Sequence, residues 1–498
     1  MQMEKTADGT KIELTWYERK QGIKLADKIR KIRGKEKRRQ RREAEQFNAG
    51  SGKQPRAKDA ERKKFSPQEQ SRRNGEHTGA RNGRHAAPRQ QHAAPDLQKL
   101  GSLFDSSSLP ADARDILKSF GSIIASSHPL NSKQRALLPG QIRELSHSLT
   151  DERSERRLGY MNQTSTLSAY VHYYLWWNIV RLTRLFANLP ASFLSLSEND
   201  ICLDIGSGPL TVPMALFIAR PELRSVPLTW YCMDISQQAL SVGEDIFLSV
   251  AAQLKSTAWK IIRVRGQLGT AIRDKARFIT CANVFNEISQ DAGMPPDFLA
   301  KKYAEQLLAY TERGDEKARF LVIEPGVPSC ARLISQLRDA FIRRGFQPCS
   351  PCPHALLEQC PMDGRREGKW CNFAFTTEEA PAELKKISDA AKLAKERAVL
   401  SFVAVERKKE GAAAESTFRV ASDPIRLPGG RTGYYACSAQ GLLLVVTQQQ
   451  LKSGECYRLP GAAVTGRTDS KSGALIVELD GRADSTRYLE KSFATLSR

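Results

Sequence analysis

The sequence lacks any long apolar run. In 498 residues, no stretch reaches the ~18 apolar residues that a membrane-spanning helix needs. The most apolar candidate, "AYVHYYLWWNIV" (169–180), runs into Arg181 and Arg184. The start, "MQMEKTADGTKIE", has neither the apolar region of a signal peptide nor the acid-poor composition of a transit peptide. We therefore expect a soluble, cytoplasmic protein with no membrane partner.

The sequence is also short of acidic residues. It has 55 Asp and Glu against 77 Lys and Arg, which gives a formal net charge of +22. Such an excess indicates polyanionic partners such as RNA. Residues 1–90 hold 26 of the basic residues and 12 of the acidic ones, with few large apolar side chains. We expect residues 1–95 to be a disordered basic tail, which is either a solvated tail or an RNA-binding arm.

The rest of the chain changes its pattern twice. Residues 96–198 carry apolar side chains at three- and four-residue spacing, which predicts a helical region. Residues 199–410 alternate strands with helices, which predicts an α/β, Rossmann-like doubly wound sheet capped by that region. Residues 415–498 show short strands separated by Gly, Pro and Asp turns, which predicts a small C-terminal β domain.

A glycine loop follows the first strand of the predicted sheet, in "LDIGSGPLTVPMALF" (203–217). The third glycine of the dinucleotide fingerprint is missing, since Pro209 and Leu210 stand there, so a pyrophosphate ligand is disfavoured. The pattern acidic–x–Gly–x–Gly resembles motif I of S-adenosylmethionine-dependent methyltransferases. An acid also ends the next strand, where the fold binds ribose hydroxyls, although it could instead cap the following helix. The resemblance implies a cofactor site made by Asp204, Gly206, Ser207, Gly208 and Asp234.

A catalytic signature is absent. The fourth strand ends in "CANVFNEIS" (281–289) and not in the Asn/Asp-Pro-Pro-aromatic sequence of amino-methylating enzymes. Cys281 precedes no proline, so the cysteine chemistry of base methylation is not indicated either. Asn283, Asn286 and Glu287 lie where a substrate would bind, but the sequence assigns them no role. The catalytic residues stay unknown.

Cysteine is scarce, yet four of the ten lie in a proline-rich insert, residues 345–373. Its prolines exclude a helix or a central strand, so another reason is needed for holding thiols together. Converging thiolates suit zinc or an iron–sulfur cluster, and the spacing Cys349-x-x-Cys352 does not decide between the two. Unconnected buried thiols are the alternative. The CxxxCxxC loop of radical enzymes is absent.

Four segments together carry a resemblance to a known family. These are "LDIGSGPLTVPMAL", "IEPGVPSCARLISQLRDAFIRRGF", "PCPHALLEQCP" and "WCNFAF". They resemble the Rsm-type, methyltransferase-like family of the small ribosomal subunit over roughly residues 150–460. Its eukaryotic members are mitochondrial small-subunit assembly factors, and it has bacterial members.

The resemblance implies that S-adenosylmethionine and a 4Fe–4S cluster are bound. Cys349 competes for the position of the fourth ligand, and a site that used it would leave the terminal domain free. We expect His354 to contact one of the cysteine ligands and not to bind the metal itself. The cluster ligands implied by the resemblance are Cys352, Cys360, Cys371 and Cys437.

Two functions fit these features. The first is a methyltransferase that acts on small-subunit rRNA. The second is a catalytically inactive, RNA-binding assembly factor with a structural zinc site. We expect association with the small ribosomal subunit, and a monomer apart from the ribosome.

Overall fold

The computed structural model describes residues 4–5, 11–12, 97–150, 159–288, 294–354, 359–363, 369–408 and 416–480. The chain divides into two units, Met1–Pro88 and Arg89–Arg498. In the first unit the described residues form one antiparallel pair, β1 (Glu4–Lys5) with β2 (Lys11–Ile12). Most of the expected basic tail therefore lies outside the described residues. Everything that follows concerns the second unit.

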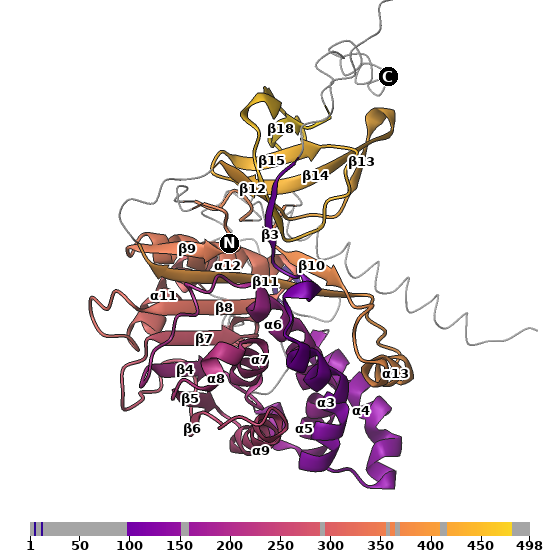
Figure 1. Ribbon diagram of the computed structural model, residues 1–498, viewed down its shortest axis with the longest axis vertical. Coiled ribbons are helices and arrows are strands. Elements are labelled where there is room, and N and C mark those ends of the chain that lie inside the picture. Colours follow the sequence, from indigo (N-terminus) through magenta and orange to yellow (C-terminus); the bar gives the residue numbers. More distant parts are fainter. Residues whose placement is uncertain are drawn as a thin grey trace, which may run out of the picture. The chain divides into compact units, whose positions relative to one another are not determined.

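A central sheet forms where the sequence alternates strands with helices, and Figure 1 shows its strands stacked side by side. The strand order is β10-β11-β8-β7-β4-β5-β6, with β9 also paired to β11. The order reverses between β4 and β7, which is the switch point where open α/β sheets bind ligands. The parallel strands are β4 (Ile201–Ile205), β5 (Thr229–Asp234), β6 (Lys260–Arg265), β7 (Phe278–Ala282) and β8 (Arg319–Pro325).

The far edge of this sheet is antiparallel. The long strand β11 (Arg397–Arg407) runs against β8, and both β9 (Phe346–Ser350) and β10 (Phe373–Thr376) pair with β11. The sheet is therefore mixed: a Rossmann-like set of five parallel strands is followed by the reversed strand β11 beside β8, which confirms the predicted α/β fold. The proline-rich insert contains β9 near its start. This strand pairs only with β11, an edge position that tolerates proline.

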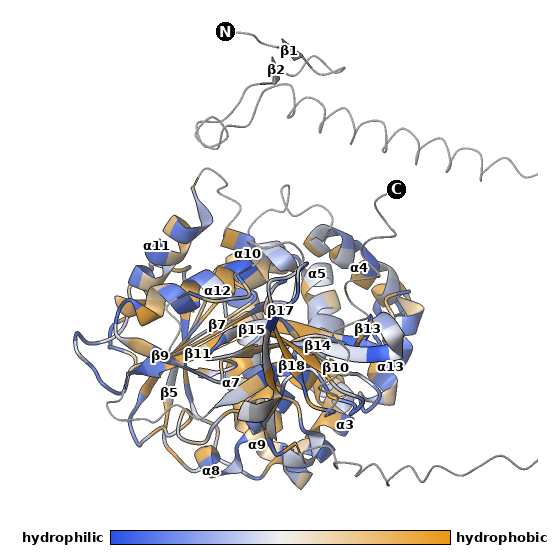
Figure 2. Cartoon of the chain, turned by 90° about the horizontal axis from the view of Figure 1, so that it is seen from above, coloured by the Kyte–Doolittle hydropathy of each residue, from blue (hydrophilic) through white to orange (hydrophobic). Residues whose placement is uncertain are grey.

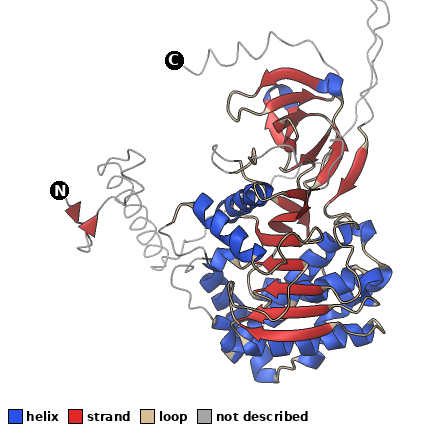
Figure 3. Cartoon of the chain, turned by 90° about the vertical axis from the view of Figure 1, so that its left-hand side faces the viewer, coloured by secondary structure: helices blue, strands red, loops and turns tan. Residues whose placement is uncertain are grey.

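Helices cover both faces of the sheet, as Figure 3 shows. Alternate strand residues face two separate apolar cores, with Cys202 in one and Leu203 in the other, as the two-residue period of a strand requires. Figure 2 shows apolar strands in the interior and mixed colours on the helices around them. The helices that follow the strands are α7 (Thr211–Ala219), α8 (Pro221–Arg224), α9 (Gln237–Gln253), α10 (Phe285–Ile288), α11 (Pro296–Leu308) and α12 (Pro328–Ile342). A further helix, α13 (Ala382–Ala390), packs against the helical region described next.

The predicted helical region contains α3 (Ala111–Ser127), α4 (Ser132–Thr150), α5 (Thr164–Ala169) and α6 (Trp176–Asn188). Between α5 and α6 the backbone winds as a π-helix over Tyr170–Leu175, a rare form that is frequent at functional sites. The aromatic side chains here are largely core, because Tyr173, Trp176 and Trp177 are buried. None of the described helices is long and apolar enough to cross a membrane.

A second sheet forms from the C-terminal residues and has its own apolar core. Its order is β17-β18-β15-β14-β12-β16-β3, with β13 paired to β14. The strand β3 (Lys99–Ser102) comes from the start of the predicted helical region, so that region begins with a strand of the other sheet. The remaining strands are β12 (Thr417–Val420), β13 (Ile425–Leu427), β14 (Arg431–Ser438), β15 (Gly441–Val446), β16 (Glu455–Arg458), β17 (Val464–Thr468) and β18 (Leu475–Glu478).

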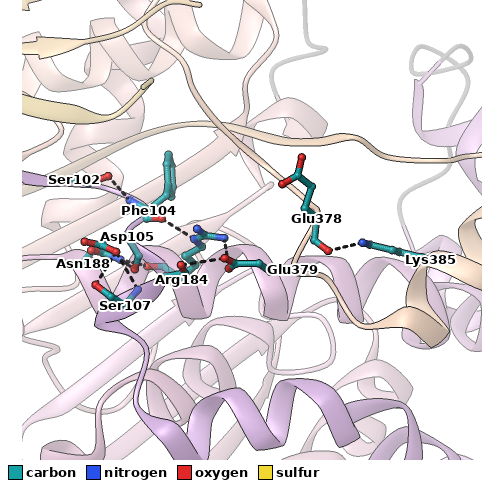
Figure 4. Close-up of polar contacts among 10 residues, drawn as sticks. Ser102, Phe104, Asp105, Ser107, Arg184, Asn188, Glu378, Glu379 and Lys385 are labelled. Carbon is teal, nitrogen blue, oxygen red and sulfur yellow. Dashed lines mark hydrogen bonds and ion pairs between the residues drawn. The ribbon is translucent and has the colours of Figure 1, made fainter. Parts of the chain in front are cut away.

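The chain that leaves β3 is fastened to α6, as Figure 4 shows. Arg184 of α6 donates its Nε hydrogen to the Phe104 carbonyl at 2.6 Å and its Nη1 hydrogen to Glu379 at 3.2 Å. Asn188, one turn further on, donates to the Asp105 carbonyl at 3.0 Å. The guanidinium also lies 4.7 Å from the centre of the Phe375 ring. These contacts join β3, α6 and the segment after β10.

Candidate functional site: a cavity at the glycine loop and a four-cysteine site

The glycine loop after β4 needs glycine at its first position. Gly206 has a φ of +67°, and a Cβ there would lie 2.4 Å from the Cγ2 atom of Val284. Gly208 also has a positive φ, of +51°. Other residues adopt this left-handed region at a cost of roughly 1–2 kcal/mol. The loop therefore approaches the end of β7 closely and exposes backbone to the space above the sheet.

Asp234 ends β5 and fastens this loop. Its two carboxylate oxygens accept hydrogen bonds from the Gly208 N–H at 2.9 Å and the Ser236 N–H at 2.8 Å. The N-cap of α9 is Ser236, whose hydroxyl accepts the Ala239 N–H, so Asp234 is not itself that cap. Burial raises the pKa of Asp234 above its usual value. Its carboxylate also borders the cavity described next.

A cavity of about 530 Å³ opens above the glycine loop and the end of β7. Gly206, Gly208 and Asp234 line it, as sequence analysis led us to expect for a shared site. Other lining residues had no signal in the sequence, because they come from the segment before α5, the π-helix, the loop after β6 and α11. These include Tyr160, Met161, Tyr170, Gln267, Lys302 and Tyr303.

Asp204 of β4 and Ser207 of the glycine loop are not among the residues that line this cavity. The Asp204 carboxylate accepts the hydroxyls of Ser207 and Thr280, each at 2.6 Å, and only 1% of the residue is exposed. Burial raises the pKa of Asp204 to about 7. These hydrogen bonds connect the loop to β4 and β7.

The end of β7 supplies the opposite wall. Asn283, with a φ of +60°, and Glu287 line the cavity, whereas Asn286 does not. The buried Glu324 of β8 accepts the backbone N–H groups of Phe285 and Asn286 at 2.8 and 3.2 Å. Burial raises the pKa of Glu324 to about 8. Glu324 thus holds the first turn of α10 in place.

The second candidate site gathers four thiols. Cys352, Cys360 and Cys371 come from the proline-rich insert, and Cys437 comes from β14 of the second sheet. Every pair among the four is close enough for one thiol to raise the pKa of another, in addition to the larger effect of burial. The pKa of Cys360 rises to about 12 for these reasons. Among the described residues, no three His, Cys, Asp or Glu side chains are arranged so that they could hold a metal ion.

His354 and Cys349 take different positions around these thiols. His354 is buried, and its Nε2 atom lies 3.5 Å from the Cys437 sulfur. Burial lowers the pKa of His354 to about 4. Cys349 lies on β9, and its thiol donates to the Ala404 carbonyl of β11 at 3.4 Å. Cys202, Cys232 and Cys281 are fully buried residues of the central sheet and lie apart from this site in sequence.

The second sheet contacts the insert at several points besides Cys437. Arg419 of β12 donates to the Pro351 carbonyl and to the Gly454 carbonyl at 2.8 Å. Thr417 donates its hydroxyl to the Pro353 carbonyl at 3.2 Å. The four thiols therefore lie where the two sheets of this unit meet.

Comparisons with known proteins find similar solved structures at low sequence identity. A search of the curated proteins finds no match. Similar solved structures include a SAM-dependent methyltransferase from Geobacter sulfurreducens in complex with S-adenosyl-L-homocysteine. It is 11% identical to this chain, with a TM-score of 0.26, and the match covers 46% of this chain and 90% of that one. A precorrin-6y methyltransferase from Geobacter metallireducens is 11% identical, with 46% and 87% covered and a TM-score of 0.26.

A tRNA methyltransferase from M. jannaschii is also 11% identical, with 44% of this chain and 48% of that chain covered and a TM-score of 0.24. The sequence model of one family, described as mitochondrial small ribosomal subunit Rsm22, matches residues 197–466. That range takes in the glycine loop, the cysteine-rich insert and most of the second sheet. The chain therefore belongs to the Rsm22 family of small-ribosomal-subunit proteins.

Proposed function

We propose that this protein binds S-adenosylmethionine in the cavity above its glycine loop and acts on the small ribosomal subunit. The main support for this proposal is Asp234, whose buried carboxylate accepts a hydrogen bond from the glycine loop and borders the cavity. Each of its oxygens accepts one backbone N–H, and a carboxylate has about four acceptor positions. The remaining positions suit the two ribose hydroxyls of the cofactor.

Membership of the Rsm22 family supports rRNA as the partner, and two functions remain for the bound cofactor. Either the protein methylates small-subunit rRNA, or it binds rRNA during assembly or translation while the cofactor stays in its cavity without reacting. Asn283 and Glu287 border the cavity after the end of β7, and we assign neither of them a catalytic role.

Sequencing the methylation of small-subunit rRNA tests the catalytic form of this proposal. A deletion strain should lose one modification, and a plasmid copy of the wild-type chain should restore it. The matched control is a plasmid copy that carries Asp234→Ala, which should not restore the modification. An unchanged methylation profile in the deletion strain would instead favour the assembly factor.

We also propose that Cys352, Cys360, Cys371 and Cys437 hold a 4Fe–4S cluster, with zinc as the alternative metal. A cluster or a zinc ion held by four thiolates carries net negative charge, so it suits a buried site that contains uncompensated cationic donors. Arg338 provides such donors, because two of its nitrogens have no hydrogen-bond partner among the described residues. The proximity of the Cys437 sulfur to the His354 ring of the insert supports Cys437 over Cys349 as the fourth ligand.

In this site the metal would connect the insert to the second sheet, and its binding would add to the stability of that junction. Anaerobic purification followed by iron, sulfide and zinc analysis tests the proposal. We expect about four irons per chain in the wild type and in Cys349→Ser, and loss of iron in Cys437→Ser. One zinc per chain without iron would show that the bound metal is zinc and not an iron–sulfur cluster.

A further inference from the structure

Arg181 of α6 is a cation beside one wall of the cavity, although it is not among the lining residues. Its Nη2 atom donates to the Oδ1 atoms of Asn178 at 3.0 Å and Asn283 at 3.4 Å. Its Nη1 atom donates to the Val399 carbonyl of β11 at 3.3 Å. Burial lowers the pKa of Arg181 to about 10, so the guanidinium stays charged at neutral pH. The helical region therefore places a positive charge at the end of β7.

Asn283 lines the cavity, and Arg181 orients its side chain. A guanidinium has donors only, so the oxygen of the Asn283 amide must face it, and the amide nitrogen remains to donate elsewhere. The backbone is fixed as well, because the Asn283 N–H donates to the Ile323 carbonyl at 2.8 Å. Its φ of +60° is uncommon outside glycine and is found at functional sites. Asn283 thus offers an oriented donor at the cavity wall.

The two sides of the cavity differ in charge. In the sheet β4 lies between β5 and β7, so Asp234 and Asn283 follow strands about 10 Å apart. A cofactor whose ribose lies at Asp234 extends one arm toward the loop after β6 and the other toward the end of β7. The loop after β6 lines the cavity with uncharged residues, 266–268. The end of β7 provides the Asn283 amide and the Glu287 carboxylate.

Only one arm of S-adenosylmethionine carries a carboxylate and an ammonium group, and the other arm is an uncharged adenine. The end of β7 offers a donor for the first group and an acceptor for the second. Arg181 strengthens the donor, because hydrogen bonds in a chain polarise one another. The lining cation Lys302 lies toward the other arm, since it shares a face of α11 with Gln306. The Nε2 atom of Gln306 lies 3.6 Å from the place of a Cβ on Gly269, in the loop after β6.

We propose that the end of β7 binds the amino-acid end of the cofactor, and that Arg181 is the positioning residue of this subsite. Asn283 donates to the carboxylate of the ligand, Glu287 accepts from its ammonium group, and Arg181 orients the Asn283 amide. This inference rests on the proposed function, because it concerns the same cavity. It gives the helical region a part in cofactor binding, since the orienting charge comes from α6.

The test compares two ligands by isothermal titration calorimetry with the full chain. S-adenosylhomocysteine contains the amino-acid end, whereas methylthioadenosine keeps the adenine and ribose without it. The variants are Arg181→Gln and Asn283→Gly, and glycine suits the positive φ at position 283, so that the amide is removed without backbone strain. The matched control is Arg184→Gln, because Arg184 lies on the same helix but bonds to Phe104 and Glu379.

We expect both variants to bind S-adenosylhomocysteine about tenfold more weakly than the wild type, with their affinity for methylthioadenosine unchanged. The control should bind both ligands as the wild type does. Asp234→Ala should weaken both ligands, because both contain the ribose. A double variant with Arg181→Gln and Asn283→Gly should bind no more weakly than Asn283→Gly, because Arg181 acts through the amide.

Several results would overturn this inference and leave the cofactor site standing. These are unchanged affinity for S-adenosylhomocysteine in both variants, an equal loss for both ligands, or equal affinity of the wild type for the two ligands. Additive losses in the double variant would overturn the positioning role of Arg181. A wild type that binds neither ligand would refute the cofactor site itself. If Arg181→Gln does not fold, Asn283→Gly and the two ligands on the wild type decide whether the subsite exists.

Discussion

Asp234→Ala tests the proposed cofactor site most directly. In the wild type the two carboxylate oxygens accept the Gly208 and Ser236 N–H groups, which leaves further acceptor positions beside the cavity. Loss of hydrogen bonds between a charged acceptor and the ribose should cost about 1–3 kcal/mol. The dissociation constant should therefore rise roughly 5- to 150-fold. Isothermal titration calorimetry with S-adenosylhomocysteine measures this change.

A control separates cofactor contact from local stability. Ser236→Ala removes the N-cap of α9 and should lower the free energy of unfolding by about 1 kcal/mol, while its dissociation constant stays close to that of the wild type. Asp234→Ala should lose both stability and affinity. The reasoning is refuted if Asp234→Ala binds the ligand as tightly as the wild type, or if wild-type protein with its metal bound shows no binding heat.

Three further predictions concern other parts of the chain. Burial raises the pKa of Glu324 from 4.5 to about 8, so the folded state retains a proton that the unfolded state releases between these values. The free energy of unfolding should fall as pH rises through this window, and chemical denaturation of Glu324→Gln should show a flatter dependence. Gly243→Ala would place a Cβ within 2.4–2.7 Å of the Pro209 backbone and should cost roughly 1–3 kcal/mol of stability by overpacking, measured by urea unfolding. Removal of residues 1–90 should weaken RNA binding and flatten its salt dependence because fewer counterions are released, and filter-binding assays with an unchanged salt slope would contradict an RNA-binding role for the tail.

Local patterns explain why much of the fold could be predicted from the sequence. The apolar strands around "LDIGSG" and "WYCMD" are short, β-rich and closed by turn or cap residues, so their positions follow from neighbouring residues. Gly206 and Gly208 were recognisable because their left-handed backbone requires glycine. Asp234 was indicated by the resemblance to methyltransferases, in which an acid ends the second strand of the sheet.

The parts that could not be predicted depend on distant residues. Lys99 of β3 pairs with Tyr457 of β16, and nothing in the four residues "KLGS" indicates a partner so far along the chain. Tyr160 of a 3₁₀ turn before α5 and Tyr170 of the π-helix both line the cavity, although the local sequence indicates only apolar helix faces. Arg338 reads as one of several basic residues on an amphipathic helix, and its burial follows from the insert packed over it.

The second sheet is held by features of different kinds. The segment after β3 is fastened to α6 through Arg184, and Arg397 of β11 forms a two-bond ion pair with Asp423, with both distances at 2.6 Å. These contacts need no metal. The four thiols lie on another side of the same junction, where Cys437 meets the insert. If a metal joins them, its loss should loosen the insert first and leave the fastening through Arg184 in place.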